Sequence, residues 1–291
     1  MIDNSAFLPA PSTLYVVATP IGNLRDITLR AIDVLRGVDA IAAEDTRVSK
    51  VLLAHYGIAP NLIALHAHNE RSQAARVIAL LAERRSVALI TDAGTPAISD
   101  PGTALVAEAR AAGFVVQPVP GPSSVTAALS VTGWPALPFT FIGFLPPKAA
   151  ARHAALDELR DHSAAMVFFE APHRIVATLS ALAASLGDER RITIAREMTK
   201  RFETLHETTL GDATVWVAAA PENQRGEFVL IVEGAPAIVD DAPGAADLRV
   251  FELLWGEMPP ARAAKLAAEI TGKSRDAFYR IALKMGSGSN S

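Results

Sequence analysis

The sequence predicts an α/β protein made of two α/β domains followed by a small C-terminal helical unit. In the first half of the chain, short apolar runs rich in β-branched residues alternate with segments of helical periodicity. This alternation is typical of βαβ units, in which helices cover both faces of a parallel sheet. This alternation of strand-like and helical segments is interrupted at residues 133–136 and then starts again. A stretch rich in Ala, Pro, Gly and Asp at 235–246 precedes the last segment of the chain. The length of 291 residues suits two domains of ordinary size.

The first predicted domain spans residues 13–135 and contains five expected strands. These strands are 14–18, 40–43, 62–65, 87–91 and 115–119, and the expected helices are 28–36, 46–55, 70–83, 103–112 and 123–131. Gly37, Gly57 and Gly113 each follow a helix, where a left-handed C-terminal cap favours glycine. Asn69 stands where an N-cap of the third helix is expected.

The second predicted domain spans residues 136–236, and the helical unit spans 247–285. Strands are expected at 139–143, 166–169, 192–195, 204–208 and 228–232, and helices at 153–159 and 175–186. Within the helical unit, Pro260 begins a helix, Gly272 ends it and Ser274 caps the next one. This spacing predicts a helix-turn-helix arrangement.

Composition excludes several classes of protein. The chain has no cysteine, which excludes disulfide scaffolds, thiolate nucleophiles and cysteine-bound metals. Its net charge of −4 limits any phosphate-binding surface to a local patch. No apolar run approaches the length of a membrane span, and the first residues do not resemble a signal peptide. We therefore expect a soluble cytoplasmic protein.

The loops that follow the strands contain most of the unusual residues. In open α/β sheets, ligands bind beyond the carboxyl ends of the strands. The loop at 91–102 is the strongest signal, because small residues let a ligand approach the backbone, two prolines stiffen it, and Asp92 and Asp100 offer acceptors. The loop at 19–26 is kinked by Pro20 and Gly22 and follows the first strand.

Three further segments each have two interpretations. Residues 44–47 form either a polar wall of a cleft or an Asp45 cap with an ion pair to Arg47. Residues 120–124 either offer free N–H groups and hydroxyls to a ligand or contain an ordinary serine cap. Residues 66–70 form either a substrate-facing loop or a plain helix cap; they include two histidines, but a third nearby metal ligand is missing, so we expect no metal site.

Taken as an ordered set, these loops resemble the tetrapyrrole methylase superfamily, and within it the ribosomal RNA small-subunit methyltransferase I family. No single motif would suffice, but together they span nearly the whole chain. The motifs are TPIGNLRD (19–26), EDTR (44–47), HNE (68–70), DAGTP (92–96), SDPG (99–102), PGPSS (120–124), GFLPPK (143–148), FEAPHR (169–174), REMTK (196–200) and GEFVL (226–230).

The resemblance implies a fold, a cofactor and a reaction. It implies two α/β domains of the tetrapyrrole methylase type with S-adenosylmethionine in the cleft between them, usually in a homodimer. It implies 2′-O-methylation of a cytidine in the decoding region of 16S rRNA, within the small ribosomal subunit. By position, the residues implied to bind the cofactor are Pro20, Asp92, Ala93, Gly94, Ile98, Ser123, Ser124, Ala195 and Gly226.

The implied chemistry needs positioning and a base rather than a metal, because the sulfonium is already a good leaving group. A ribose hydroxyl reacts poorly while protonated, so a general base should help. Candidate catalytic residues are Asp100, Glu70 and Arg47, and Glu44 is a less favoured base. Phosphate-binding candidates are Lys148, Arg174 and Lys200 in the body of the protein and Lys273, Arg275 and Arg280 in the helical unit.

Two other functions fit parts of the same pattern. A tetrapyrrole methyltransferase would use the same scaffold, and a non-catalytic RNA-binding module could keep the cofactor pocket. Residues 262–284 contain six basic and two acidic side chains in an otherwise acidic protein, which favours RNA. The alternative for this segment is a solvated helix pair packed on the body of the protein.

Overall fold

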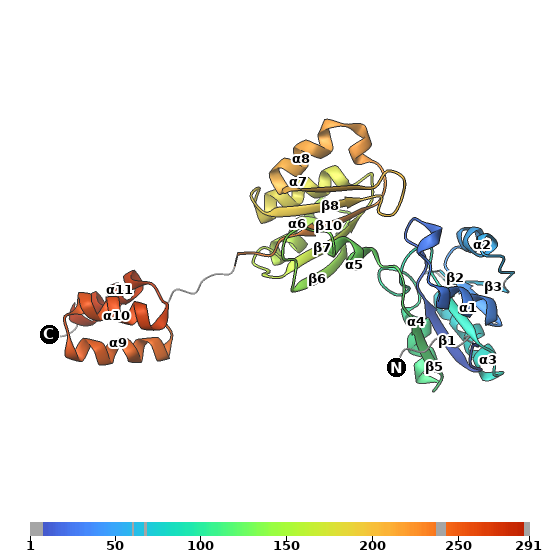
Figure 1. Ribbon diagram of the computed structural model, residues 1–291, viewed down its shortest axis with the longest axis horizontal. Coiled ribbons are helices and arrows are strands. Elements are labelled where there is room, and N and C mark those ends of the chain that lie inside the picture. Colours follow the sequence, from blue (N-terminus) through green and yellow to red (C-terminus); the bar gives the residue numbers. More distant parts are fainter. Residues whose placement is uncertain (1–7, 60, 67–68, 237–242, 288–291) are drawn as a thin grey trace. The chain divides into compact units, whose positions relative to one another are not determined.

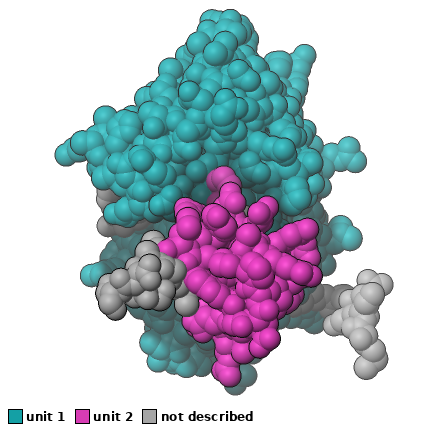
Figure 2. Space-filling view, turned by 90° about the vertical axis from the view of Figure 1, so that its left-hand side faces the viewer, with its two compact units in different colours: residues 1–235 teal, residues 236–291 magenta. Residues whose placement is uncertain are grey.

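The computed structural model describes residues 8–59, 61–66, 69–236 and 243–287. The chain divides into two compact units, residues 1–235 and residues 236–291 (Figures 1 and 2). Among the described residues, no helix has both the length and the apolarity needed to cross a bilayer. The first unit contains two separate sheets, and the second unit contains helices alone.

The first sheet is parallel and has the strand order β3-β2-β4-β1-β5. Its strands are β1 (Thr13–Val17), β2 (Ala40–Ala43), β3 (Leu62–Ala64), β4 (Val87–Ile90) and β5 (Val115–Val119). Its helices are η1 (Leu24–Asp26), α1 (Leu29–Gly37), α2 (Thr46–His55), α3 (Glu70–Ala82), α4 (Thr103–Ala111) and α5 (Ser124–Leu129). All five predicted strands and all five predicted α-helices are present, with small shifts at their ends.

Both faces of this sheet are buried, which explains the nearly continuous apolar runs of its strands. Alternate residues of β1, β2 and β4 pack against α1 and α2 on one face and against α3 and α4 on the other. Val17 and Ile90 belong to the first of these cores, and Leu14 and Leu89 to the second. Parallel sheets are normally covered by helices on both faces.

The second sheet is mixed, with the order β6-β7-β10-β8-β9 (Figure 1). Its strands are β6 (Phe139–Phe144), β7 (Ala165–Glu170), β8 (Arg191–Arg196), β9 (Thr204–Thr209) and β10 (Phe228–Val232). Its helices are α6 (Ala149–Glu158), α7 (Ile175–Leu186), α8 (Leu210–Ala219) and the short η2 (Pro221–Gln224). Only β6 and β7 pair in parallel, because β10 runs antiparallel to both β7 and β8, and β9 antiparallel to β8.

One face of the second sheet packs against α6, α7 and α8. The other face packs against α5 and Trp134. The indole Nε1 of Trp134 donates a hydrogen bond of 3.0 Å to Thr193 on β8. Thus α5, which the sequence assigns to the first predicted domain, packs on the second sheet. The domain bounds 13–135, 136–236 and 247–285 stay predictions.

Several local predictions were wrong. Gly37 is the last residue of α1 and does not have a positive φ. Its lack of a side chain serves close packing, since a Cβ there would lie 2.6 Å from Pro9. Asn69 precedes α3 without capping it, because its side chain accepts from the His66 amide and donates to the Ala64 carbonyl. Gly57 and Gly113 have φ of 64° and 81°, which confirms their predicted left-handed caps.

Two helices of the second half also differ from expectation. The helix predicted at 153–159 begins at Ala149, directly after a pair of prolines and Lys148. The helix α8 was not expected, because its Val-Trp-Val run resembles a strand. It forms because Thr209 caps it by accepting from the Asp212 amide, and because Leu210, Ala213 and Val217 are buried against the second sheet.

The second compact unit contains α9 (Ala245–Glu257), α10 (Pro260–Thr271) and α11 (Arg275–Ser287). Its own core is formed by Phe251, Phe278 and small alanines, and the two phenylalanine rings lie 5.3 Å apart. As predicted, α10 starts at Pro260 and ends at Gly272, which has a φ of 73°. Ser274 accepts from the Asp276 amide and caps α11.

Candidate functional site

A pocket of about 330 Å³ lies in the first compact unit and is lined by loops and strands from both of its sheets. Five lining residues come from the chain segments around the first sheet: Ile21, Ala93, Ser99, Asp100 and Ser124. Ten belong to the strands of the second sheet or to the loops that follow or precede them: Phe144, Phe169, Glu170, Ala171, Pro172, Ala195, Met198, Glu227, Phe228 and Val229. A volume of this size suits a small-molecule ligand.

Hydrogen bonds join the loops that follow β1, β4 and β5 into one rim. The backbone of Thr19 exchanges two hydrogen bonds, of 2.9 and 3.1 Å, with that of Gly94. The Thr19 hydroxyl also donates to the Thr91 carbonyl. The Thr95 hydroxyl donates to the Pro122 carbonyl at 3.3 Å, which links the loop after β4 to the loop after β5. The three most unusual loops of the sequence therefore meet.

The loop after β4 is conformationally strained at the pocket. Ala97 and Ser99 adopt left-handed φ values of 67° and 65°, and the glycines at 94 and 102 have positive φ as well. Non-glycine residues in this region cost free energy, and such positions cluster at functional sites. The two strained residues flank Ile98, which is exposed, and precede Asp100.

Glu70 holds the end of this strained loop. One of its carboxylate oxygens accepts from the amides of Gly102 and Ala104, at 3.0 and 2.8 Å. It therefore caps the start of α4, where four N–H groups lack helical partners. Glu70 is not among the residues that line the pocket. The structure thus gives this candidate base a different task, as a helix cap.

Asp100 lines the pocket and lies in an acidic environment. Burial raises its pKa to about 6, and repulsion from Glu44 and Asp92 adds to the increase, although the nearby Thr91 hydroxyl opposes it. Burial also raises the pKa values of Glu44 and Asp92. Near neutral pH, Asp100 can therefore both exist as the carboxylate and accept a proton readily.

Arg47 lies on the exposed start of α2, near enough to Asp92 to favour its charged form. Its side chain is 88% exposed, and its guanidinium pairs with the Asp45 carboxylate at 2.6 Å. Asp45 also accepts from the Arg47 amide and so caps α2. Hydrogen bonding to Arg47 lowers the pKa of Asp45 to about 2. Of the two interpretations of residues 44–47, these contacts match the cap with an ion pair.

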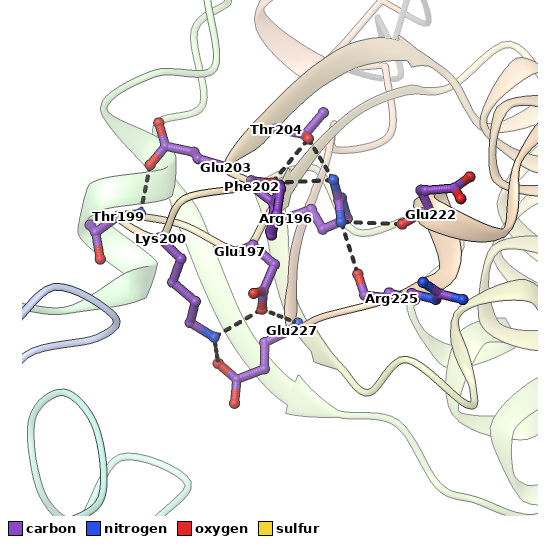
Figure 3. A network of polar contacts seen from close by, with 10 residues as sticks. All are labelled: Arg196, Glu197, Thr199, Lys200, Phe202, Glu203, Thr204, Glu222, Arg225 and Glu227. Carbon is purple, nitrogen blue, oxygen red and sulfur yellow. Dashed lines mark hydrogen bonds and ion pairs between the residues drawn. The ribbon is translucent and has the colours of Figure 1, made fainter.

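On the side of the second sheet, the loop after β8 is tied down by Arg196 (Figure 3). Its guanidinium donates to the carbonyls of Glu222, Arg225 and Phe202 and to the Thr204 hydroxyl, at 2.9 to 3.2 Å. These contacts connect the end of β8 to η2, to the segment before β10 and to the start of β9. The sequence marked Arg196 as the start of the REMTK motif at a strand end, but not as the anchor of this loop.

The same loop contains Lys200, which bridges two carboxylates (Figure 3). Its ammonium lies 2.9 Å from Glu197 and 2.8 Å from Glu227, a residue that lines the pocket. Burial opposes the charged form of Lys200, but hydrogen bonds to both carboxylates outweigh it and raise its pKa. Gly226 packs tightly on Glu197, since a Cβ at Gly226 would lie 2.3 Å from the Glu197 Cγ.

Two glycines allow the loops of the two sheets to touch. A Cβ at Gly22, in the loop after β1, would lie 2.6 Å from the Lys200 Cγ and 2.8 Å from the Met198 carbonyl. A Cβ at Gly143, on β6, would lie 3.2 Å from the Ser99 hydroxyl. Both contacts occur beside pocket-lining residues, so they fix the width of the pocket.

The predicted cofactor-binding residues and Asp100 either line the pocket or lie next to a lining residue in the chain. Ala93, Asp100, Ser124 and Ala195 line the pocket. Immediate chain neighbours of lining residues are Pro20, Asp92, Gly94, Ile98, Ser123 and Gly226. Ser123 precedes α5 without a side-chain cap, so the serine-cap interpretation of residues 120–124 does not hold. The His68 of the resemblance motif lies outside the described residues.

Two of the predicted phosphate ligands are engaged within the protein. The Arg174 Nε lies 3.1 Å from the buried Glu170 carboxylate, and another guanidinium nitrogen donates to the Leu145 carbonyl. Lys200 is engaged by its two carboxylates, whereas Lys148 is exposed just before α6. In the helical unit, Lys273 lies in the turn before α11, and Arg275 and Arg280 are exposed on that helix.

Comparison with family models assigns the chain to two of them. The model described as Tetrapyrrole (Corrin/Porphyrin) Methylases matches residues 13–214. The model described as the RsmI C-terminal HTH domain matches residues 241–286.

Curated relatives are similar over nearly the full length of the chain. A protein of Xylella fastidiosa (strain Temecula1) is 51% identical over 94% of this chain and 99% of the relative. One of Escherichia coli O157:H7 is 46% identical over 93% of this chain and 94% of the relative. Both are named ribosomal RNA small subunit methyltransferase I.

Solved structures share the fold at low sequence identity. Cobalt precorrin-4 methyltransferase is 18% identical with a TM-score of 0.57, covering 76% of this chain and 94% of its own. Diphthine synthase is 18% identical with a TM-score of 0.58, covering 76% of this chain and 90% of its own.

Proposed function

Because the chain belongs to the tetrapyrrole methylase family and, within it, to the ribosomal RNA small subunit methyltransferase I family, we propose that it methylates small-subunit ribosomal RNA with S-adenosylmethionine. The proposed target is the 2′-hydroxyl of a cytidine in the decoding region of 16S rRNA. The observation that carries this proposal is the pocket shared by both sheets, with Asp100 and its raised pKa in the wall. An rRNA substrate also implies a cytoplasmic enzyme.

The pocket suits a sulfonium cofactor in shape and in charge. Ala93, Ser124 and Ala195 present small side chains, so a ligand can approach their backbone. Asp100 adds negative charge, which favours a cation in a partly buried site, whereas the charge of Glu227 is offset by Lys200. When bound, S-adenosylmethionine supplies an activated methyl group whose leaving group is a neutral thioether. We assign its binding to Ala93, Ser124 and Ala195 together with Pro20, Asp92, Gly94, Ile98, Ser123 and Gly226.

Asp100 is our proposed general base. Asp100 would accept the proton of the ribose hydroxyl as the ribose oxygen takes up the activated methyl group that the cofactor would supply, with the neutral thioether as leaving group. A carboxyl with a pKa of about 6 is largely ionised at neutral pH and is a better proton acceptor than an ordinary aspartate. Glu70 is less suitable because its carboxylate caps α4, and Arg47 because it is exposed and paired.

The remaining task of the enzyme is to align the two reacting atoms. Orientation of this kind can contribute ~7–11 kcal/mol to catalysis. The tied rim of the first sheet and the Arg196-held loop of the second sheet both contribute residues to the pocket, so they would fix both reactants.

The helical unit is our proposed RNA-contact unit. It has its own core, a helix-turn-helix geometry, and Lys273, Arg275 and Arg280 at the turn and on α11. Phosphate contacts by such side chains add affinity that depends on salt. Lys148 is the best-placed phosphate contact on the first unit, because Arg174 and Lys200 are engaged by carboxylates. A homodimer, which the family resemblance implies, completes the proposal, and sedimentation would test it.

One experiment tests the reaction and its target together. Small ribosomal subunits from cells lacking this methylation would be incubated with the protein and isotopically labelled S-adenosylmethionine. The RNA would then be digested and mapped by mass spectrometry. We expect one labelled cytidine with the methyl group on its ribose.

The outcomes separate the proposal from its alternatives. A label on a base would contradict 2′-O-transfer, and a label only in an added tetrapyrrole would favour the small-molecule enzyme. Cofactor binding without turnover on either substrate would favour the non-catalytic RNA-binding module.

A further inference from the structure

The last residue of β6 is an exposed phenylalanine at the pocket. Phe144 is 54% exposed and lines the pocket together with Phe169 of β7. Their rings meet edge to face with centroids 5.7 Å apart, and Phe169 makes a second such contact with Phe141 at 5.0 Å. Phe144 therefore presents an aromatic face that is open to a ligand in the pocket.

A β-bulge places Phe144 on this face. The pairing of β6 with β7 is regular up to Phe141, then skips Ile142, and resumes with Gly143 opposite Phe168, so that Phe144 lies opposite Phe169. Side chains alternate along a strand, so in a regular strand Phe144 would face the opposite side from Phe141. The extra residue brings both phenylalanines to the same face. Bulges often re-aim a side chain beside an active site.

The backbone around Phe144 is fixed on both sides. Gly143 has a φ of 75° and packs so closely on Ser99 that a Cβ would lie 3.2 Å from its hydroxyl. On the other side, the Leu145 carbonyl accepts from Arg174, which is anchored by the buried Glu170. Two prolines follow in the chain. A ligand that contacts Phe144 would therefore not need to order its backbone first.

In the proposed reaction, the nucleobase of the target nucleotide has as yet no assigned partner in the protein. A nucleotide that enters a protein pocket leaves the base stack of its RNA, and proteins usually replace that stacking with aromatic side chains. Gly143 contacts Ser99, the neighbour of Asp100, so the aromatic wall adjoins the proposed base in the same pocket. The residues assigned to the cofactor come from other segments of the chain.

We propose that Phe144, supported by Phe169, is the stacking surface for the nucleobase of the RNA nucleotide that is methylated. This inference rests on the proposed function and adds a substrate-binding residue to it. Stacking tolerates any base, so Phe144 contributes affinity and orientation rather than recognition of cytosine.

The test compares Phe144→Ala and Phe144→Tyr in the full-length protein, using small ribosomal subunits as substrate. We expect Phe144→Ala to bind S-adenosylmethionine like the wild type in calorimetry, and to lower kcat/KM for the subunits about tenfold or more. Phe144→Tyr keeps an aromatic face and should restore most of this activity. Phe139→Ala is the matched control, because Phe139 is a partly exposed phenylalanine at the other end of β6 and does not line the pocket.

Three results would overturn the inference. One is an unchanged kcat/KM in Phe144→Ala, and another is an equally large decrease in Phe139→Ala. The third is weakened cofactor binding in a Phe144→Ala protein that melts like the wild type, which would assign the ring to the cofactor. A wild-type enzyme that does not label small subunits would refute the proposed function itself, and the inference with it.

Discussion

At the scale of single residues, Asp100 carries the chemical part of the proposal. It is partly buried, faces two other carboxylates and follows a residue with a left-handed φ. Each of these features costs stability, because burial and repulsion disfavour the charged form and the backbone is strained. Costs of this kind concentrate where function needs them.

The pH dependence of the reaction should report this carboxyl group. Its raised pKa means that the protonated form, which cannot accept a proton, predominates below about pH 6. We expect kcat/KM to fall about tenfold per pH unit below that value and to level off above it. Asp100→Asn should lower kcat by ~10²–10⁴-fold at pH 7.5 and remove this inflection.

Cofactor affinity is the control for that variant. Asp100→Asn keeps the shape of the side chain but removes a charge that favours the sulfonium, so the affinity for S-adenosylmethionine in calorimetry should fall far less than kcat does. If Asp100→Asn kept the wild-type kcat, the general base would have to be another group.

At the scale of elements, the site is formed by loops that other elements hold in place. Glu70, the first residue of α3, caps the start of α4 and so anchors the strained loop before it. Arg196, the last residue of β8, joins four backbone segments around the opposite wall. Loops placed on a rigid scaffold in this way can carry function without flexibility.

Replacement of Glu70 should affect stability more than chemistry. We expect Glu70→Ala to destabilise the protein by about 1 kcal/mol, because α4 loses its N-terminal acceptor. Glu70→Gln keeps an acceptor oxygen and should retain most of the stability and of kcat. Urea unfolding and turnover on small subunits would measure both. If kcat of Glu70→Gln fell as far as that of Asp100→Asn, Glu70 would be the better candidate base.

Replacement of Arg196 should loosen the wall of the pocket. Arg196→Gln loses most of the four hydrogen bonds, and Arg196→Lys cannot restore their planar geometry. We expect a dissociation constant for S-adenosylmethionine that is about tenfold higher in both variants, and faster hydrogen exchange in residues 197–203. Calorimetry and exchange mass spectrometry would measure these effects.

Arg225→Gln is the matched control for Arg196, because the network uses only the carbonyl of Arg225 (Figure 3). It removes the same charge and should change neither the dissociation constant for S-adenosylmethionine nor the hydrogen exchange of residues 197–203. Equal effects in the two variants would mean that charge, rather than the network, supports the wall.

At the scale of the whole molecule, the proposed tasks divide between the two compact units. The first unit contains the pocket and the acidic group, and the second is a helical unit with its own core that carries Lys273, Arg275 and Arg280. An acidic chain can bind RNA when its basic residues are gathered locally, because screening limits the reach of distant charges. This division lets the cofactor site and the RNA-binding surface vary independently.

The division predicts the effect of removing charge from the helical unit. A full-length protein with Lys273→Gln, Arg275→Gln and Arg280→Gln should bind S-adenosylmethionine normally and methylate small subunits less efficiently. The salt dependence of RNA binding should become shallower, by ~0.7–0.9 in the logarithmic slope for each phosphate that the variant no longer neutralises. Filter binding at several salt concentrations would measure the slope.

The control for this variant removes the same charge elsewhere. Lys50, Arg76 and Arg110 are exposed on helices of the first unit, and their replacement by Gln should leave the salt dependence nearly unchanged. The same slope in both triple variants would mean that the helical unit does not bind RNA specifically.

The sequence by itself determined the order and type of most elements in both sheets, and the loops that form the pocket. Apolar periodicity does this because strands such as β2 and β4 are buried on both faces. Proline and glycine mark the strand-end loops through their backbone preferences, and those preferences are local.

Only the tertiary structure decided what each polar side chain does. Glu70 became a cap because α4 starts beside it, and Arg174 became the partner of a buried carboxylate. Phe144 faces the pocket because one extra residue in β6 shifts its pairing with β7. Hydrogen bonds, burial and register depend on neighbours that are distant in sequence, so residue type and spacing cannot specify them.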